Sequence, residues 1–132
     1  VYTSNDNSVV KTVYDPSPVG FKLPPSNVFT GFTTTGGNTN NPSEINGTWD
    51  SSLKGWNFYT DSSKSKTIFF SASGYRDYSN GGANNVGSEG MCWSAIPYNR
   101  KFGYDQNFGL SKVRPLNYNN RAYGIGVRSS QE

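Results

Sequence analysis

Residues 90–95 read Gly-Met-Cys-Trp-Ser-Ala, residues 102–110 read Phe-Gly-Tyr-Asp-Gln-Asn-Phe-Gly-Leu, and residues 113–128 read Val-Arg-Pro-Leu-Asn-Tyr-Asn-Asn-Arg-Ala-Tyr-Gly-Ile-Gly-Val-Arg. Apolar and polar positions alternate in these stretches, as they do in half-buried strands, because successive side chains of a strand point to opposite faces. The polar positions are Asn, Asp, Tyr, Arg and Gly, residue types that also suit adaptable binding surfaces. The C-terminal third therefore predicts a sheet that displays a ligand-binding surface.

The strand predicted at residues 102–109 has two faces of different character. One face carries Tyr104, Gln106 and Phe108, and the other carries Asp105, Asn107 and Gly109. With the two aromatic rings in the core, we expect the Asp-Asn-Gly face to be exposed to solvent, and Gln106 to need hydrogen-bond partners inside the protein. Residues 116–120 then form a predicted polar loop that carries one aromatic side chain, Tyr118.

The composition indicates one folded domain that is rich in strands and turns. The 132 residues suit a single domain. Only 33% of them are hydrophobic but 15% are aromatic, so the eight Phe, nine Tyr and three Trp must supply much of the buried area. Disordered chains are poor in aromatic residues, and the 15 Gly favour turns over helices. We expect a lead-in or linker at residues 1–12 and the domain at residues 13–132.

The N-terminal part predicts one short strand followed by a rigid corner. The strand ends the lead-in, and its candidate packing residues are Val9, Val10 and Val13. Four prolines between residues 14 and 25 exclude a regular helix there and predict an extended segment.

Residues 26–32 favour a helix of one or two turns. Ser26 is the expected N-cap, and Val28, Phe29 and Phe32 are expected on one side of the helix. Residues 33–48 are polar and rich in Gly and Asn, which predicts a surface loop. Strands are predicted at residues 55–60 and 67–70, which should pair as a hairpin, and at residues 87–96, 102–109 and 122–129.

The residue types exclude most catalytic chemistry. The chain has no His, which excludes Ser-His-Asp and Cys-His catalysis and His-based metal sites. Its single cysteine, Cys92, excludes a disulfide within the chain and a thiolate metal cluster. The nine acidic residues are spread singly, and no Gly-rich phosphate loop is present. We therefore expect no enzyme activity and no cofactor.

Charge and hydropathy limit the partners. The net charge is +3, without the dense basic stripe or motif of a nucleic-acid-binding protein, so nucleic acid is not an expected partner. No run of eighteen apolar residues and no signal peptide occurs, so we expect no direct membrane insertion in this fragment. The first residue is Val1 rather than Met, which suggests a mature protein or an excised fragment.

Four motifs, in order, resemble those of the Fibrobacter succinogenes major paralogous domain, which is common in surface proteins and pilus-tip adhesins of Bacteroidetes. They are Tyr-Asp-Pro-Ser-Pro-Val-Gly-Phe-Lys-Leu-Pro at residues 14–24, Ala-Ser-Gly-Tyr-Arg at residues 72–76, Gly-Met-Cys-Trp-Ser-Ala at residues 90–95, and Arg-Ala-Tyr-Gly-Ile-Gly-Val-Arg at residues 121–128. The resemblance covers about residues 12–130. It implies a C-type-lectin-like fold, a compact α+β domain of mostly short antiparallel strands and long loops with one or two short helices. It also implies an extracellular or cell-surface location, at a pilus tip or anchored to an outer membrane, with a phage tail tip as a lesser possibility.

The chain departs from the family pattern in two ways. The calcium-lectin signatures Glu-Pro-Asn, Gln-Pro-Asp and Trp-Asn-Asp are absent. The opening motif has Ser17 where the family often has Cys, and Ser129 and Ser130 stand near the C-terminus, so a family disulfide that ties the ends together is missing here.

A narrower resemblance is to variable proteins that retroelements diversify and that use the same fold. Adenine-directed mutagenesis of Asn codons in such proteins changes chosen positions and leaves a scaffold fixed. The positions that resemble scaffold are Gly90, Trp93, Ser94, Tyr104, Phe108, Val113, Pro115, Arg121, Gly124, Val127 and Arg128. The positions between them that can be reached from an Asn codon are the predicted ligand-binding residues: Cys92, Tyr98, Asn99, Arg100, Phe102, Asp105, Asn107, Gly109, Arg114, Leu116, Asn117, Tyr118, Asn119 and Tyr123. Met91, Lys101, Gln106 and Lys112 cannot be reached in this way.

The resulting hypothesis is an extracellular receptor or adhesin domain whose ligand is an unknown protein or glycan on a cell surface. The aromatic side chains of Tyr98, Phe102, Tyr118 and Tyr123 are its expected hot spots. One alternative is a structural or assembly module of a pilus or surface protein, in which a strand at residues 1–13 would be exchanged with another chain. Another is a calcium-dependent glycan lectin, because Glu44, Asn46 and Asp50 lie close together in an oxygen-rich loop.

Overall fold

The computed structural model describes residue 7 and residues 9–131; residues 1–6, 8 and 132 lie outside the description. In this range the chain is mostly antiparallel strand with few helices. The elements in chain order are β1 (Phe21–Lys22), η1 (Ser26–Phe32), η2 (Pro42–Glu44), β2 (Gly47–Asp50), β3 (Gly55–Tyr59), β4 (Thr67–Ser71), β5 (Tyr75–Arg76), β6 (Ala83–Asn84), β7 (Glu89–Pro97), β8 (Phe102–Gly109), β9 (Lys112–Asn120) and β10 (Ser130–Gln131). None of the helices in this part of the chain has the length and hydrophobicity needed to cross a bilayer.

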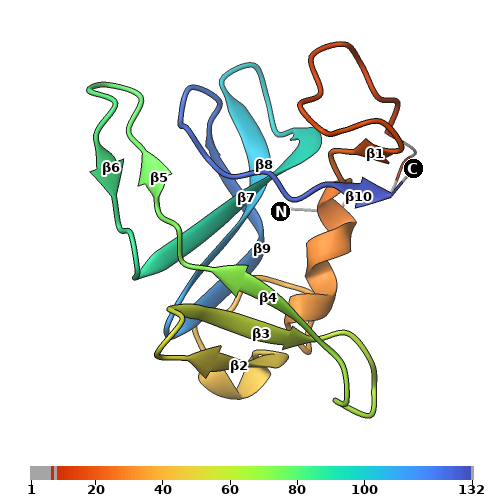
Figure 1. Cartoon of the computed structure of the whole chain (residues 1–132), viewed down its shortest axis with the longest axis vertical. Coiled ribbons are helices and arrows are strands. Elements are labelled where there is room, and N and C mark those ends of the chain that lie inside the picture. Colours follow the sequence, from red (N-terminus) through yellow and green to blue (C-terminus); the bar gives the residue numbers. More distant parts are fainter. Residues whose placement is uncertain (1–6, 8, 132) are drawn as a thin grey trace.

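The strands form two larger sheets and two short ribbons, all antiparallel (Figure 1). One sheet has the order β2-β3-β4 and the other has the order β7-β8-β9, so that β3 and β8 are the central strands. The ribbons pair β1 with β10 and β5 with β6. Helix η1 packs against the β7-β8-β9 sheet, mainly against β9.

The hairpin predicted at residues 55–60 and 67–70 is confirmed as β3 and β4. The prediction of a surface loop for all of residues 33–48 is wrong at its end. Residues from Gly47 onward belong to β2, which pairs with β3 and places Trp49 opposite Trp56. The two indole rings pack edge to face with centroids 5.8 Å apart, so a cross-strand aromatic pair stabilises a strand whose first and last residues, Gly47 and Asp50, are poor strand formers.

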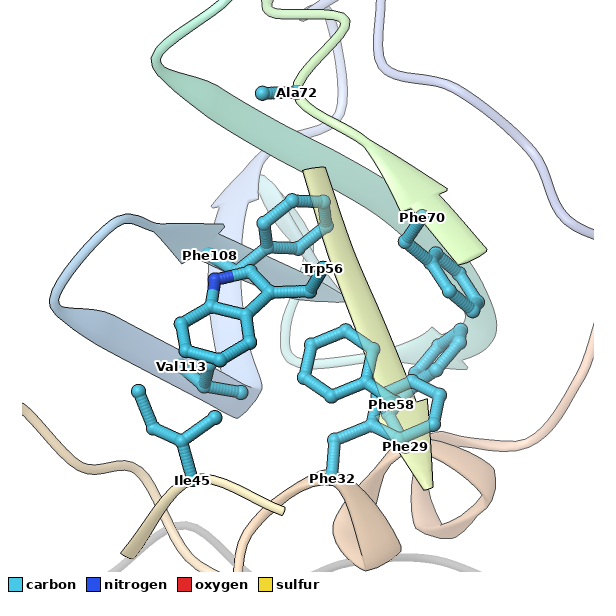
Figure 2. Close-up of a cluster of buried hydrophobic side chains, with 9 residues drawn as sticks. All are labelled: Phe29, Phe32, Ile45, Trp56, Phe58, Phe70, Ala72, Phe108 and Val113. Carbon is cyan, nitrogen blue, oxygen red and sulfur yellow. The ribbon is translucent and has the colours of Figure 1, made fainter. Parts of the chain in front are cut away.

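An aromatic cluster joins the two sheets and η1 (Figure 2). Phe58 of β3 is its centre, because this ring contacts those of Phe32, Trp56, Phe70 and Phe108 at centroid distances of 4.1 to 6.0 Å. The indole Nε1 of Trp56 donates to the carbonyl oxygen of Gly109 at 2.9 Å, which satisfies the only polar atom of that buried side chain. The prediction that aromatic rings would supply the buried area is confirmed in this cluster.

The helix predicted at residues 26–32 is present as the 3₁₀ helix η1. Phe29 and Phe32 are buried on it, as predicted. Two details are wrong: the N-cap is Pro25, without a side-chain cap, and Val28 is exposed. Three residues per turn place positions 26, 29 and 32 on one side, which explains why Ser26 rather than Val28 is buried.

The strand predicted to end the lead-in is not formed in residues 9–13. Val10 and Val13 are exposed rather than packed, and residues 1–6 and 8 of the proposed exchanged strand lie outside the described part of the chain. The side chain of Lys11 holds residues 9–13 in place instead, because its Nζ donates to the carbonyl oxygens of Ser17 and Phe21, at 2.5 and 2.6 Å.

The last strand of the C-terminal sheet is not where the sequence predicted it. Residues 116–120, predicted as a loop, belong to β9, whereas residues 122–129, predicted as a strand, contain only isolated bridges, from Gly124 to Arg76 and from Gly126 to Cys92. The register between β8 and β9 shifts between Asp105 and Asn107, and this irregularity lets the strand accommodate Pro115.

The two ends of the domain meet in the ribbon of β1 and β10. Beside this ribbon the Ser129 hydroxyl donates to the Ser17 hydroxyl at 2.7 Å, although the residues are 112 positions apart. Ser129, rather than Ser130, therefore stands opposite Ser17.

Candidate ligand-binding site

A polar pocket of about 700 Å³ lies along the outer part of β9. This volume falls within the range of about 300–1,000 Å³ that small-molecule sites occupy. The pocket is lined by Asn38, Thr39, Asn40, Tyr78, Phe102, Arg114, Asn117, Tyr118, Asn119, Asn120 and Tyr123. Among the residues that the structure describes, no acidic side chain lines it.

The wall formed by residues 38–40 is attached to the edge of β9. Thr39 pairs with Val113 through two backbone hydrogen bonds, of 2.9 and 3.0 Å. The side chain of Asn38 extends this pairing, because its Nδ2 donates to the Leu116 carbonyl oxygen and its Oδ1 accepts from the Leu116 N–H. The loop thus runs beside residues 113–116 of β9, and Arg114 and residues 117–120 of β9 line the pocket.

Beneath the pocket lies the buried carboxylate of Asp105, with an exposed fraction of 0%. The Nδ2 atom of Asn117 lies 3.1 and 3.3 Å from its two oxygens, and the Nδ2 atom of Asn119 lies 3.3 and 3.2 Å from them. Asn117 is directly opposite Asp105 in the β8–β9 ladder, and Asn119 follows on the same face of β9. The alternation of strand side chains therefore gathers the three groups.

Asp105 has a perturbed acidity because it is buried. Desolvation raises the pKa of this carboxyl from its usual 3.8 to about 7, and the hydrogen bonds from Asn119 and Asn117 offset part of that effect. No lysine or arginine forms an ion pair with it within the described residues. The site therefore holds a carboxyl group that is partly ionised near neutral pH and that accepts hydrogen bonds from two uncharged amides.

Aromatic rings also line the pocket. The rings of Phe102 and Tyr118 pack edge to face at 5.6 Å, and Tyr98 stacks on Tyr118 at 4.3 Å. From the β5–β6 ribbon, Tyr78 packs edge to face against Tyr123 at 5.0 Å. Each pocket aromatic is thus held by a second ring, which limits the freedom that it loses when a ligand binds.

One cationic side chain lines the pocket. The guanidinium Nη2 of Arg114 donates to the Oδ1 atom of Asn40 at 3.2 Å. This bond joins β9 to the loop of residues 38–40 and uses one of the five N–H donors of the guanidinium.

The structure brings six of the predicted ligand-binding residues together in this pocket: Phe102, Arg114, Asn117, Tyr118, Asn119 and Tyr123. Tyr98 lies behind this group, stacked on Tyr118. Asn99 and Arg100 are exposed in the turn between β7 and β8. The Asn99 side chain accepts from the N–H groups of Lys101 and Phe102, so it shapes the turn.

Four of the predicted ligand-binding residues are buried instead: Asp105, Asn107, Gly109 and Leu116. The expectation that the Asp-Asn-Gly face of β8 is open to solvent is wrong, because every residue of this central strand from 103 to 109 is buried. Asn107 hydrogen-bonds to the Glu89 carboxylate, and Glu89 pairs with Lys112 at 2.5 Å. Burial raises the pKa of Glu89, but the bonds from Lys112, Asn85 and Asn107 leave it below its usual value.

Cys92 also does not belong to the pocket. It is half-buried, packs against the aromatic cluster and pairs in a bridge with Gly126. Burial raises the pKa of its thiol to about 11, so the thiol stays protonated at neutral pH. Cys92, predicted as a ligand-binding residue, is therefore a small hydrophobic side chain at the edge of the core.

The pocket includes five residues that the sequence reasoning missed: Asn38, Thr39, Asn40, Tyr78 and Asn120. Most of them lie in polar loops rich in Asn and Gly that the sequence does predict, but the composition of a loop does not indicate which strand it packs against. The pairing of Thr39 with Val113 across more than seventy residues is a tertiary fact that alternation does not encode.

The predicted scaffold positions differ in what they contribute. A Cβ atom on Gly90 would collide with the Phe108 ring, so only glycine fits there. Arg121 donates from Nη2 to the Asn99 carbonyl oxygen at 2.9 Å and from Nε to that of Phe102, and so holds the β7–β8 turn. Val127, in contrast, is 41% exposed and is not part of the buried core.

The oxygen-rich loop considered for calcium forms local hydrogen bonds. The Glu44 carboxylate accepts from the Thr39 hydroxyl at 2.6 Å, and the Asp50 carboxylate accepts from Ser52 and from the Leu53 N–H. The Asn46 side chain donates to the carbonyl oxygen of Gly31. These bonds direct the three side chains to three different turns. Among the described residues, no group of three His, Cys, Asp or Glu side chains could hold a metal ion together.

No protein-family model, curated protein or solved structure matches this chain.

Proposed function

We propose that this chain is an extracellular ligand-binding domain of the C-type-lectin-like class, whose binding surface is the pocket along β9. The observation that carries the proposal is the convergence of six predicted contact residues from β8, β9 and the segment after β9 on one polar, aromatic pocket. Paired aromatic rings next to adaptable amides are the residue types of recognition surfaces rather than of ordinary solvated sheets. The four sequence motifs and the antiparallel strands support the fold assignment.

Diversification by a retroelement is the narrower form of this proposal. Phe102, Arg114, Tyr118 and Tyr123 combine a predicted variable codon with a place in the pocket. Buried positions such as Asp105 would tolerate few substitutions, so diversification would act on the pocket subset. A reverse transcriptase gene beside a near-copy of the coding segment, with differences only at adenines, would support this form; a locus with neither feature would contradict it.

Binding can be tested on a printed glycan array and a tiled peptide array. We expect the wild-type domain to give signals that Asn119→Arg abolishes, because the long cationic side chain would occupy the pocket. Lys54→Glu, a charge change at an exposed position outside the pocket lining, is the control and should keep them. Absence of signal for the wild type on both arrays, or the same signals with Asn119→Arg, would contradict the proposal.

A structural or assembly module is the second candidate, and one observation favours it. Val13, Tyr14 and Val19 are more than 90% exposed, and such large apolar side chains on one segment suit contact with another subunit. Light scattering at rising protein concentration would test this: a concentration-dependent oligomer that Val13→Ser with Val19→Ser prevents would support assembly, and a monomer at every concentration would contradict it.

A further inference from the structure

The side chains of Asn117 and Asn119 form the floor of the pocket, and their hydrogen bonds to Asp105 determine which of their amide atoms face away from the protein interior. Because the Nδ2 atoms of Asn117 and Asn119 both face the Asp105 carboxylate, their Oδ1 atoms point away from it. The Asn119 nitrogen also lies 3.8 Å from the Met91 sulfur, which gives its second N–H a neighbour on the buried side. Within the described part of the chain neither Oδ1 atom accepts a hydrogen bond. The floor thus presents two acceptors, two positions apart on one face of β9.

The charges around this floor disfavour an ionic ligand. An anionic group would approach the buried Asp105 carboxylate, which has no cationic partner among the described residues. A cationic group would approach Arg114, which lines the pocket, and the exposed Arg100 and Lys101 in the turn next to Phe102. An anion would be repelled by Asp105 and a cation by the arginine and lysine side chains, so a neutral group that donates hydrogen bonds fits best.

The walls add flat apolar surface to these acceptors. Tyr78 and Tyr123, from the β5–β6 ribbon and the segment after β9, line the pocket, as do Phe102 of β8 and Tyr118 of β9. Because side chains alternate along a strand, the Tyr118 ring lies on the opposite face of β9 from Asn117 and Asn119. The C–H face of a pyranose ring can pack on such rings while its hydroxyls donate to amide oxygens. A neutral molecule with several neighbouring hydroxyls therefore suits the amide acceptors, the aromatic rings and the charges of the pocket.

We propose that the pocket along β9 binds a glycan, that two neighbouring sugar hydroxyls donate to the Oδ1 atoms of Asn117 and Asn119, and that Asp105 is the positioning residue that turns both oxygens outward. The inference rests on the proposed ligand-binding function and names its ligand class. Because no acidic side chain lines the pocket, the hydroxyls meet the amides directly, and binding needs no calcium.

The probes are methyl α-mannopyranoside, methyl β-galactopyranoside and N-acetylglucosamine, with N-acetylarginine amide and sodium acetate as ionic comparisons. Each is titrated into ¹⁵N-labelled protein in the presence of EDTA, and the side-chain amide signals of Asn117 and Asn119 are followed by NMR. We expect at least one sugar to shift these signals with a dissociation constant in the millimolar range, and the two ionic probes to leave them unchanged.

Asp105→Asn tests the positioning role. Without the carboxylate, the two amides lose the group that orients them, so the affinity for the sugar should fall at least tenfold. The side-chain amide protons of Asn117 and Asn119, which the carboxylate should shift downfield in the wild type, should lose that shift. Asn119→Leu removes one acceptor and keeps Asp105, and should weaken binding to a similar degree even if Asp105→Asn does not fold. Asp50→Asn is the matched control, because the same change is made to a carboxylate outside the pocket, and it should bind as wild type does.

The outcomes separate this inference from the proposed function. Shifts with the ionic probes instead of the sugars, or with no probe, would overturn the glycan assignment, while pocket-dependent signals on the peptide array would still support a ligand-binding domain. Sugar binding that Asp105→Asn leaves unchanged would overturn the positioning role. Sugar binding that EDTA abolishes and calcium restores would overturn direct recognition by the amides.

Discussion

The β2-β3-β4 sheet and the β7-β8-β9 sheet are both three-stranded and antiparallel, but their central strands bury different side chains. β3 buries Trp56 and Phe58, whereas β8 buries Asp105, Gln106 and Asn107 in succession. The first sheet is an ordinary hydrophobic layer. The second has polar groups inside: Asp105 accepts hydrogen bonds from Asn117 and Asn119, and Asn107 bonds to the Glu89 carboxylate. The difference shows that the buried polar side chains of β8 depend on hydrogen bonds from the neighbouring strands β7 and β9, with Gln106 as the exception.

Linking the two ends should stabilise both sheets equally. Ser17→Cys with Ser129→Cys should form a disulfide, because the two hydroxyl oxygens are 2.7 Å apart. Closing a loop of this length should raise the free energy of unfolding by about 4–5 kcal/mol, measured by urea denaturation with and without reductant. Amide hydrogen exchange should slow in β3 and β8 alike. Free thiols in the oxidised protein, or protection in one sheet only, would contradict a domain that unfolds as one unit.

Phe58→Ala tests how much the aromatic cluster around β3 contributes to stability. This ring contacts four others, so its loss should lower the free energy of unfolding by about 3–5 kcal/mol in urea denaturation. Leu53→Ala, at an exposed position, is the control and should change it by less than about 0.5 kcal/mol. A loss below about 1 kcal/mol for Phe58→Ala would mean that the cluster is not the main core.

Asp105 should make the polar sheet sensitive to pH. Its folded-state pKa of about 7 lies above the value of 3.8 expected for an unfolded chain, so between these values the folded protein holds a proton that the unfolded chain releases. The contribution of this group to stability is therefore fully present below about pH 4 and is lost as the pH rises through 7. Each pKa unit corresponds to about 1.4 kcal/mol, so the whole change should be on the order of 4 kcal/mol.

The measurement is the free energy of unfolding of wild type minus that of Asp105→Asn, from pH 4 to pH 8. Subtraction removes the other carboxyls, such as Asp50, Asp61 and Asp77, whose pKa values are lowered by turn hydrogen bonds from serines and backbone N–H groups. The difference should fall as the pH rises. A difference that is constant or that rises would show that Asp105 is ionised throughout this range.

Alternation predicted which residues share a face, but not which faces are covered. For β3 and β4 the aromatic positions were sufficient, because an aromatic side that alternates with Asn and Tyr has one obvious buried face. For β8 the grouping of Asp105 with Asn107 was right, yet the assumption of a half-buried strand failed, since both faces of β8 are covered. β9 was missed in part because Pro115 and several Asn residues are poor strand formers, and only pairing with β8 and with Thr39 overrides that preference.

Gln106 gives the smallest expected effect and the sharpest contrast with its neighbour Asp105. It lies on the opposite face of β8, is fully buried, and neither amide atom has a hydrogen-bond partner in the described structure. Leaving such atoms unsatisfied is unfavourable, so Gln106→Met, which keeps the length and removes the amide, should raise the free energy of unfolding by about 1–3 kcal/mol in urea denaturation. Gln131→Met, at an exposed position in β10, should change it little. Destabilisation by Gln106→Met would instead mean that buried water bonds to this amide. In that case Asp105 and Gln106 would both have hydrogen-bond partners, and the two faces of β8 would not differ in this respect.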